Sequence, residues 1–105
     1  MHVLLKHPLV NLDVEDAAFW YDQRDSRVAI RFVDEAHDAM FAAAKNPLHH
    51  SVQFADVRRV RLHGFPHRAF FLVRDGMVLM LAVLHGAREI EPLVLGRKTQ
   101  GDFLT

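Results

Sequence analysis

Two long apolar segments on either side of Asp75-Gly76 constrain the fold of this chain more than any other feature of its sequence. The segments run from residue 68 to 74 and from residue 77 to 85, and both are almost continuously apolar between their ends. Asp-Gly between two such runs is a strong signal for a two-residue hairpin turn, because the turn favours residues that tolerate positive φ. The sequence therefore predicts two neighbouring antiparallel strands.

A two-residue turn also predicts which residues of the hairpin face each other. Arg74 would face Met77, so that facing residue numbers sum to 151, and Arg68 would face Val83. In this register Arg68 and His85 are diagonal neighbours on one face of the sheet, about 7–8 Å apart. We therefore expect their side chains to meet.

The two faces of the predicted hairpin differ in charge. One face would carry Arg68, Phe70, Leu72 and Arg74. The other would carry only apolar side chains, namely Ala69, Phe71, Val73, Val78, Met80 and Ala82, and we assign it to the helices. A bulge at Gly86 or a slipped turn would exchange these faces.

Two consecutive helices are predicted before the hairpin. Residues 11 to about 24 have helical spacing, with Asn11 or Asp13 as the N-cap. A second helix is expected from its N-cap Ser26 to Asn46-Pro47, where proline pushes the preceding residue out of the helical region. Its apolar stripe is Val28, Phe32, Ala36, Met40 and Ala44. A short polar turn between the helices predicts an antiparallel helical hairpin.

Two shorter strands complete the predicted fold. Residues 3–5 form a first strand, and a later strand alternates apolar Val60 and Leu62 with Arg59, Arg61 and His63. The sequence thus predicts a single α+β domain over residues 1–105, with an N-terminal strand and a two-helix hairpin packed on a mainly antiparallel sheet of three to four strands. The tail from about residue 97 can be flexible in this interpretation.

Composition excludes several classes of protein. A chain of 105 residues, half of them hydrophobic, can bury a core of its own. It has no cysteine, so disulfides and cysteine-ligated metal sites are excluded, and we expect a cytoplasmic location. The longest apolar run, residues 77–84, is far shorter than the roughly 20 residues of a membrane span. We expect neither a membrane span nor an export signal.

The chain offers little for metal or nucleophilic chemistry. It has eight histidines, but His49-His50 lie in a loop, and a Gly-Phe-Pro turn separates His63 from His67. The serines, Ser26 and Ser51, have no predicted base beside them, and no glycine-rich phosphate loop is present. We expect no metal and no cofactor.

Three side chains remain as candidates for function. His85, at the end of an apolar strand, titrates near neutrality, although it can also simply close the strand with a hydrogen bond. Arg88 follows it closely. Arg68 lies within a sheet and needs a partner, which can be Glu89 or Glu91, a polymer phosphate or a partner protein.

The element order and four motifs resemble the RelE/ParE superfamily of bacterial type II toxins, from Val3 to about Leu95. The motifs are Ala18-Phe19-Trp20-Tyr21, Lys45-Asn46-Pro47, Phe65-Pro66-His67-Arg68 and Val83-Leu84-His85-Gly86-Ala87-Arg88-Glu89. The last motif is the most specific and looks ParE-like. The resemblance implies plasmid stabilisation and growth arrest, with a cognate antitoxin that wraps and neutralises the toxin and binds operator DNA.

Two activities are compatible with this resemblance. RelE-like members are ribosome-dependent mRNA endonucleases, whereas ParE-like members poison DNA gyrase; an inactive member that only binds antitoxin is a third alternative. The net charge is zero, which fits a protein target better than RNA. Ala87 also stands where many relatives have a second arginine, and the predicted strands contain no lysine or tyrosine. We therefore expect gyrase as the target and an oligomer with antitoxin as one possible assembly.

The resemblance and the hairpin register together give the expected site residues. For a nuclease the catalytic residues would be His85, Arg68 and Arg88. The residues expected to bind target or antitoxin are Arg59, Arg61, Arg68, Phe70, Leu72, His85, Arg88 and Glu89. The antitoxin would lay apolar and acidic residues over Phe70, Leu72 and the arginines.

We predict that Arg88→Ala relieves toxicity and leaves antitoxin binding intact, because the resemblance places Arg88 in the toxin motif. Growth of cells that express the variant measures toxicity, and co-purification with the antitoxin measures binding. A variant that remained fully toxic would contradict this placement of the site.

Overall fold

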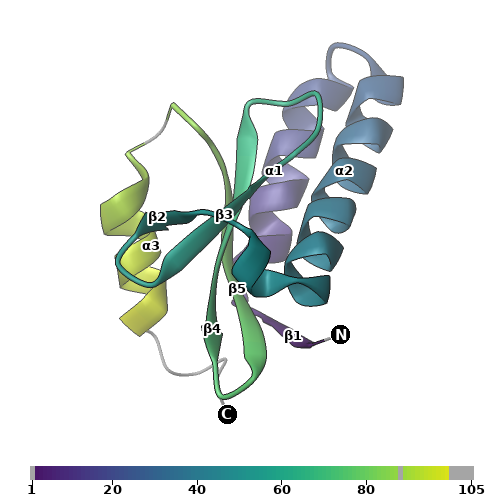
Figure 1. The fold of residues 1–105 in the computed structure, drawn as a ribbon. Coiled ribbons are helices and arrows are strands. Elements are labelled where there is room, and N and C mark those ends of the chain that lie inside the picture. The colour runs from purple at the N-terminus through teal and green to yellow at the C-terminus, as the bar shows by residue number, and fades with distance from the viewer. Residues whose placement is uncertain (1, 88, 100–105) are drawn as a thin grey trace.

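The computed structural model describes residues 2–87 and 89–99 as five strands, three α-helices and one short 3-10 helix (Figure 1). In chain order these are β1 (Val3–Lys6), α1 (Val10–Asp22), α2 (Ser26–Lys45), η1 (Pro47–His49), β2 (Val52–Phe54), β3 (Val57–Arg61), β4 (His67–Arg74), β5 (Met77–His85) and α3 (Ile90–Thr99). None of the helices in these ranges is long and apolar enough to span a membrane.

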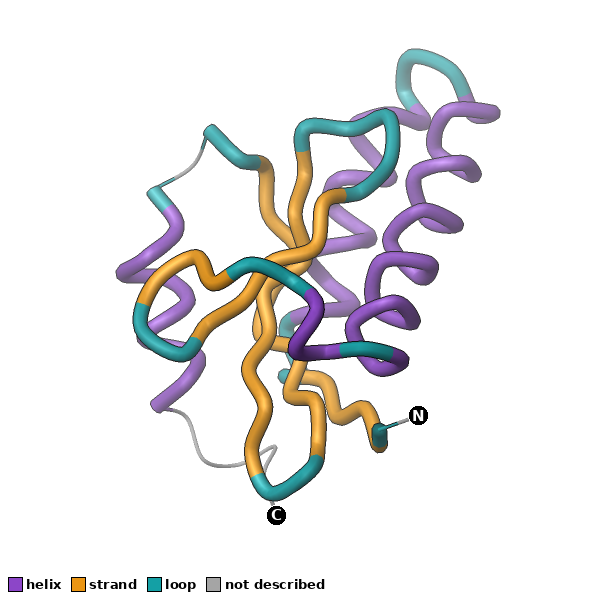
Figure 2. The backbone as a smooth tube through the Cα atoms, in the orientation of Figure 1, coloured by secondary structure: helices purple, strands orange, loops and turns teal. Residues whose placement is uncertain are grey.

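The five strands form one mixed sheet in the order β1-β5-β4-β3-β2. Strand β1 runs parallel to β5, and the other neighbouring strands are antiparallel. The helical hairpin α1–α2 covers one face of the sheet and α3 covers the other, which Figure 2 shows as helices on both sides of the strands. The predicted α+β class and helical hairpin are confirmed.

Each face of the sheet buries its own apolar cluster. The cluster under α1 and α2 includes Val14, Phe32, Ala36, Met40, Ala69, Phe71, Val78, Met80 and Val83. The cluster under α3 includes Val57, Phe70, Leu72, Leu79, Leu81, Ala82, Leu84, Ile90 and Val94. A sheet buried on both faces explains why the two hairpin strands are almost continuously apolar in sequence.

The Asp75-Gly76 turn joins β4 and β5 as predicted, with positive φ angles of 53° and 74°. Facing residue numbers sum to 151 from the turn as far as Phe71, which faces Met80. The register then shifts by one residue, so that Phe70 faces Ala82 and Leu81 is the extra residue of a β-bulge. The predicted register is therefore right for the half of the hairpin nearest the turn.

The bulge overturns the predicted neighbourhood of Arg68 and His85. Arg68 faces Leu84, and His85 faces His67, so Arg68 and His85 lie on opposite faces of the sheet. Ala82 likewise joins the cluster under α3 instead of the helical-hairpin side. The sequence allowed for a bulge at Gly86 that would exchange the two faces of the hairpin. Such an exchange does occur, but the bulge that causes it is at Leu81.

In both helices the N-cap is a different residue from the predicted one. Helix α2 begins at Ser26, but its N-cap is Asp25, whose Oδ1 accepts a hydrogen bond from the Arg27 backbone N–H at 2.9 Å. Helix α1 begins at Val10, and its N-cap residue Leu9 makes no side-chain cap. A capping role for Asp13 is excluded because its carboxylate is bonded elsewhere in the fold.

Two elements lie outside the sequence prediction. Strand β2 adds a fifth strand, which pairs with β3 through a tight connection where Ala55 has a φ of 47°. Helix α3 extends to Thr99, so residues 97–99 of the expected tail are helical, while residues 100–105 lie outside the described residues. Proline at position 92 lies in the first turn of α3, where its missing N–H costs no helical hydrogen bond.

A buried ion pair fastens α3 to the rest of the domain. Both guanidinium Nη atoms of Arg97 donate to the Asp13 carboxylate, at 2.5 and 2.9 Å, and only about a tenth of each side chain is exposed. The same Asp13 accepts from the Val83 backbone N–H at 3.0 Å, and Arg97 also donates to the Leu81 carbonyl at 3.1 Å. One carboxylate therefore connects α1, β5 and α3.

We predict that Asp13→Ala strongly destabilises the domain, because it leaves the Arg97 charge buried without its carboxylate. Loss of one partner of a buried ion pair costs about 3–5 kcal/mol. The matched control is Asp56→Ala, which breaks the more exposed pair with Lys98 and should cost less than about 1 kcal/mol. Chemical denaturation of both variants measures the difference. Equal, small losses would show that Asp13 does not hold the fold.

Candidate functional site

Three of the predicted arginines share the sheet face that α3 partly covers. Arg61 faces Arg68 across the β3–β4 pairing, and Arg59 faces Phe70, which belongs to the cluster under α3. Because facing residues share a sheet face, Arg59, Arg61 and Arg68 point to the same side. We call these three residues the arginine face. Arg58 points to the other side and donates to the His50 carbonyl at 2.7 Å.

Arg68 is half-buried in a pocket beside the start of α3. The pocket has a volume of about 590 Å³ and is lined by Gln53, Phe54, Arg68, Gly86, Glu89, Ile90, Glu91, Pro92 and Leu95. Within the described part of the chain, Arg68 forms no ion pair, even though two glutamates line the same pocket. A guanidinium in this position is available to a carboxylate or phosphate from another molecule.

Gly86, beside Arg68, lets the end of β5 approach the Pro66 carbonyl closely. A Cβ at position 86 would lie 3.1 Å from the Pro66 carbonyl oxygen and 3.6 Å from the Arg68 Cζ. The Gly86 N–H also donates to the Pro66 carbonyl at 2.7 Å, so the two backbones are already in close contact. A side chain at this position would crowd the Pro66 carbonyl, whereas its contact with Arg68 would be an ordinary van der Waals contact.

The two apolar residues of the expected antitoxin surface lie inside the protein. Phe70 is fully buried and Leu72 is 1% exposed, both in the cluster under α3. The side chains that we expected an antitoxin to cover are thus covered by a helix of the same chain. On the same sheet face, Arg61 is exposed and Arg59 is partly exposed.

His85 lies on the opposite face, beside α1, and its closest ring neighbour is His67. The two ring centroids are 5.2 Å apart, and the Nδ1 of His85 accepts a hydrogen bond from the Ala87 N–H at 3.0 Å. This bond closes the strand end, which is the structural role that the sequence left open for His85. It also leaves the proton of a neutral His85 on Nε2.

The remaining predicted residues flank the beginning of α3. Glu89 is exposed and lines the same pocket as Arg68. Arg88 lies outside the described residues, so its part in the site stays a prediction. Across residues 2–87 and 89–99, no group of three histidine, aspartate or glutamate side chains has the spacing of a metal site.

The comparison with protein families agrees with this architecture. The family model for the ParE toxin of the type II toxin-antitoxin system, parDE, matches residues 4–90. The chain belongs to the ParE toxin family. This match covers most of the chain, from β1 through the whole sheet to the first residue of α3, and it confirms the resemblance found in the sequence.

Membership of the ParE family gives this protein a place in a toxin-antitoxin system. ParE toxins pair with a cognate antitoxin, so a partner protein belongs to its biology. None of the curated proteins matches the chain. The arginine face and the pocket beside α3 lie within or next to the matched region, whereas Arg97, which anchors α3, lies beyond it.

His67 of this ParE protein was considered in the sequence only as a candidate metal ligand and as part of the Phe65-Pro66-His67-Arg68 motif. It is buried between Phe32, Tyr21 and His85, and its Nδ1 has no hydrogen-bond partner among the described residues. Burial, and then the nearby His85, lower the pKa of His67 from 6.5 to about 4. The bulge in β5 creates this arrangement, because it turns His85 towards His67.

We predict that the stability of this protein falls with acidification below pH 6.5, in part through His67. Its pKa is about 4 in the folded chain and 6.5 when unfolded, so the unfolded chain binds more protons between these values. The free energy of unfolding should therefore decrease as the pH falls, with a contribution of up to about 1.4 kcal/mol per pH unit.

The measurement is urea denaturation between pH 7 and pH 4 for the original chain and for His67→Phe. The variant should lack this part of the pH dependence, whereas the control His63→Gln, at an exposed position, should retain it. The same pH slope in His67→Phe and in the original chain would contradict the assignment.

Proposed function

We propose that this ParE toxin, when free of its antitoxin, arrests growth by inhibiting DNA gyrase. The observation that carries the proposal is the separation of His85 from Arg68 by the bulge at Leu81. A nuclease of the kind considered in the sequence analysis needs an acid or base and a phosphate-binding arginine around one reacting group. Here these side chains lie on opposite faces of the sheet.

The distribution of charge also supports a protein target. The net charge of the chain is zero, with −3 on residues 1–52 and +3 on residues 53–105. Binding to RNA depends mainly on neutralising many phosphates, which requires a broad basic surface. Only Arg68 of the arginine face lines the pocket, together with Glu89 and Glu91, and such a mixed surface suits a limited contact with carboxylates of a protein.

The same arginine face is our proposed contact for the antitoxin. Arg61 is exposed, Arg59 donates to the Val52 carbonyl at 3.1 Å, and none of the three forms an ion pair with a described residue. Acidic side chains of an antitoxin can therefore pair with them without breaking an internal ion pair. Glu89 would border this contact, and antitoxin bound there would block access of the target.

An mRNA endonuclease is the second candidate, and one observation favours it. The convergence of Arg59, Arg61 and Arg68 on one face would also suit a phosphate group. If the protein is an endonuclease, its catalytic histidine and its arginines would have to reach the same RNA from opposite faces of the sheet. An inactive protein that only binds antitoxin is the remaining alternative.

We predict that the purified chain inhibits gyrase supercoiling and that the double variant Arg61→Ala/Arg68→Ala does so at least about tenfold less effectively, because it removes two charged contacts. The matched control is Arg27→Ala, which removes an arginine that is almost fully exposed at the start of α2. This control should inhibit gyrase like the original chain.

A second assay separates the alternatives. Translating extracts are tested for codon-linked mRNA cleavage with the same three proteins. Cleavage together with normal gyrase activity would overturn the proposal in favour of the endonuclease. Neither effect, with antitoxin binding retained, would identify an inactive member of the family.

A further inference from the structure

The end of strand β5 is closed by a hydrogen bond that depends on the charge of a single imidazole. The Nδ1 of His85 accepts a hydrogen bond from the Ala87 backbone N–H at 3.0 Å. A ring nitrogen accepts a hydrogen bond only while it carries no proton. The bond therefore exists only when His85 is neutral and its proton is on Nε2.

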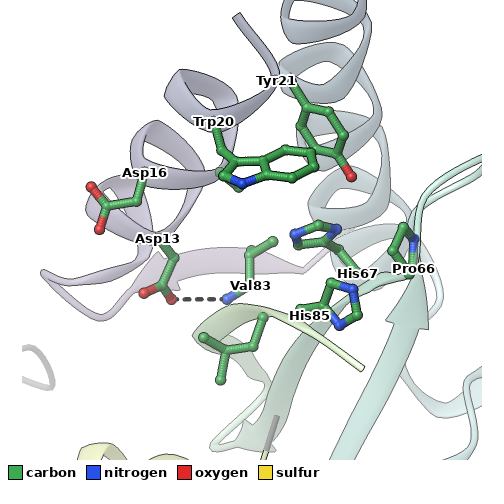
Figure 3. Close-up of a pocket in the computed structure, with 10 residues that line it drawn as sticks. Asp13, Asp16, Trp20, Tyr21, Pro66, His67, Val83 and His85 are labelled. Carbon is green, nitrogen blue, oxygen red and sulfur yellow. Dashed lines mark hydrogen bonds between the residues drawn. The ribbon is translucent and has the colours of Figure 1, made fainter. Parts of the chain in front are cut away.

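The ring of His85 is open to solvent. His85 is exposed, and it lines a pocket of about 590 Å³ between α1 and the ends of β4 and β5 (Figure 3). Its neighbour His67, in contrast, is 8% exposed, and its Nδ1 is buried. Histidine side chains in general change charge between about pH 5 and pH 8. Of these two imidazoles, His85 is the one that water reaches freely.

Protonation of His85 turns its hydrogen-bond acceptor into a donor. An imidazolium carries a proton on both ring nitrogens, so Nδ1 would point its own N–H at the Ala87 N–H. The two groups repel each other, and the bond is lost. Because the closed strand end excludes this proton, acidification favours the open form.

The β4 side of His85 offers no partner for a positive charge. The ring centroids of His85 and His67 are 5.2 Å apart. Burial, and then the nearby His85, lower the pKa of His67 to about 4, so this second ring stays neutral over the range in which exposed histidines titrate. A neutral imidazole does not compensate the charge of an imidazolium beside it.

The charged groups of α1 lie on the other side of the pocket. Asp13, Asp16 and Tyr21 line it, and Figure 3 shows both carboxylates on the side away from the His85 ring. The Asp13 carboxylate is already bound by Arg97. Within residues 2–87 and 89–99, His85 forms no ion pair. No described carboxylate therefore fixes the protonated ring in its present position.

Gly86 limits the part of the chain that this proton can affect. Its N–H donates to the Pro66 carbonyl at 2.7 Å, in a backbone hydrogen bond that involves no imidazole. Release must therefore begin at Ala87. From there the chain leads to Glu89, which lines the pocket of Arg68, and then to α3.

We propose that His85 is a pH-sensitive latch on the chain between β5 and α3. The neutral imidazole holds Ala87 in place, and the imidazolium releases it. Release loosens the segment that carries Glu89 to the pocket of Arg68. This edge of the pocket is thus fixed at neutral pH and free to move under acid conditions.

The latch is independent of the gyrase proposal. It requires neither a partner nor a target, and it is measured on the free chain. A chain that failed to inhibit gyrase could still carry the latch, and a failed latch would leave the arginine face as described.

Amide hydrogen exchange of the full chain, followed by NMR between pH 7.5 and pH 5.5, tests the latch. The quantity compared is the protection of the Ala87 amide, which is its exchange rate relative to that of an unstructured peptide at the same pH. This protection should fall about fivefold as His85 is protonated, which corresponds to the loss of one hydrogen bond. The Gly86 amide is the internal control and should keep its protection.

Two variants isolate the imidazole. His85→Asn keeps an acceptor for the N–H two residues along the chain but does not titrate, so Ala87 should stay protected at every pH. His85→Phe has no acceptor, and its Ala87 amide should exchange fast at every pH. The matched control His63→Gln removes an exposed histidine outside the latch and should behave like the original chain.

Any of four results would overturn the proposal. Two concern pH: constant protection of Ala87 in the original chain, and the same pH dependence in His85→Asn. A parallel loss of protection at Gly86 would show that the whole strand end opens for another reason. Protection of Ala87 that survived in His85→Phe would show that the imidazole does not hold this residue.

Discussion

The ion pair between Asp13 and Arg97 is the interaction on which the two-sided architecture depends. Strand β1 covers the outer edge of β5 only as far as Met80. Beyond it, Arg97 donates to the Leu81 carbonyl and Asp13 accepts from the Val83 N–H. Because these side chains come from helices on opposite faces, one contact both completes the edge of the sheet and holds α3 over its apolar cluster.

The bulge at Leu81 decides how the chemistry of this protein is divided between the two faces. Without the extra residue, His85 would lie near Arg68, and the sheet would carry a histidine and arginines on one surface. With it, the arginines face α3 and the histidines face α1. A shift of one residue thus separates what would be a single mixed site into one face with arginines and one with histidines.

Local sequence signals predict the two long helices and the β4–β5 hairpin. Strand β2, the bulge, α3 and the role of Asp13 were not predicted. Three of these signals lie within short stretches of sequence: Asp75-Gly76 predicts the turn, the apolar stripe predicts α2, and Asn46-Pro47 predicts its end. The structure confirms all three. Strand β2 has only three residues, with Ala55 where a turn glycine would be expected. The bulge, α3 and the role of Asp13 depend on partners up to 84 residues away, for which the sequence carries no local pattern.

The parallel pairing of β1 with β5 has a consequence for how the protein is made. Residues 3–6 pair with residues 77–80, and the Asp13 carboxylate binds the Val83 N–H and the Arg97 guanidinium. During translation β1 must therefore wait for residues 77–80, and the Asp13 carboxylate for Arg97, before these contacts can form. The surfaces on both faces of the sheet are therefore completed only after β5 and α3 have been made, and a nascent chain that ends before them carries neither surface.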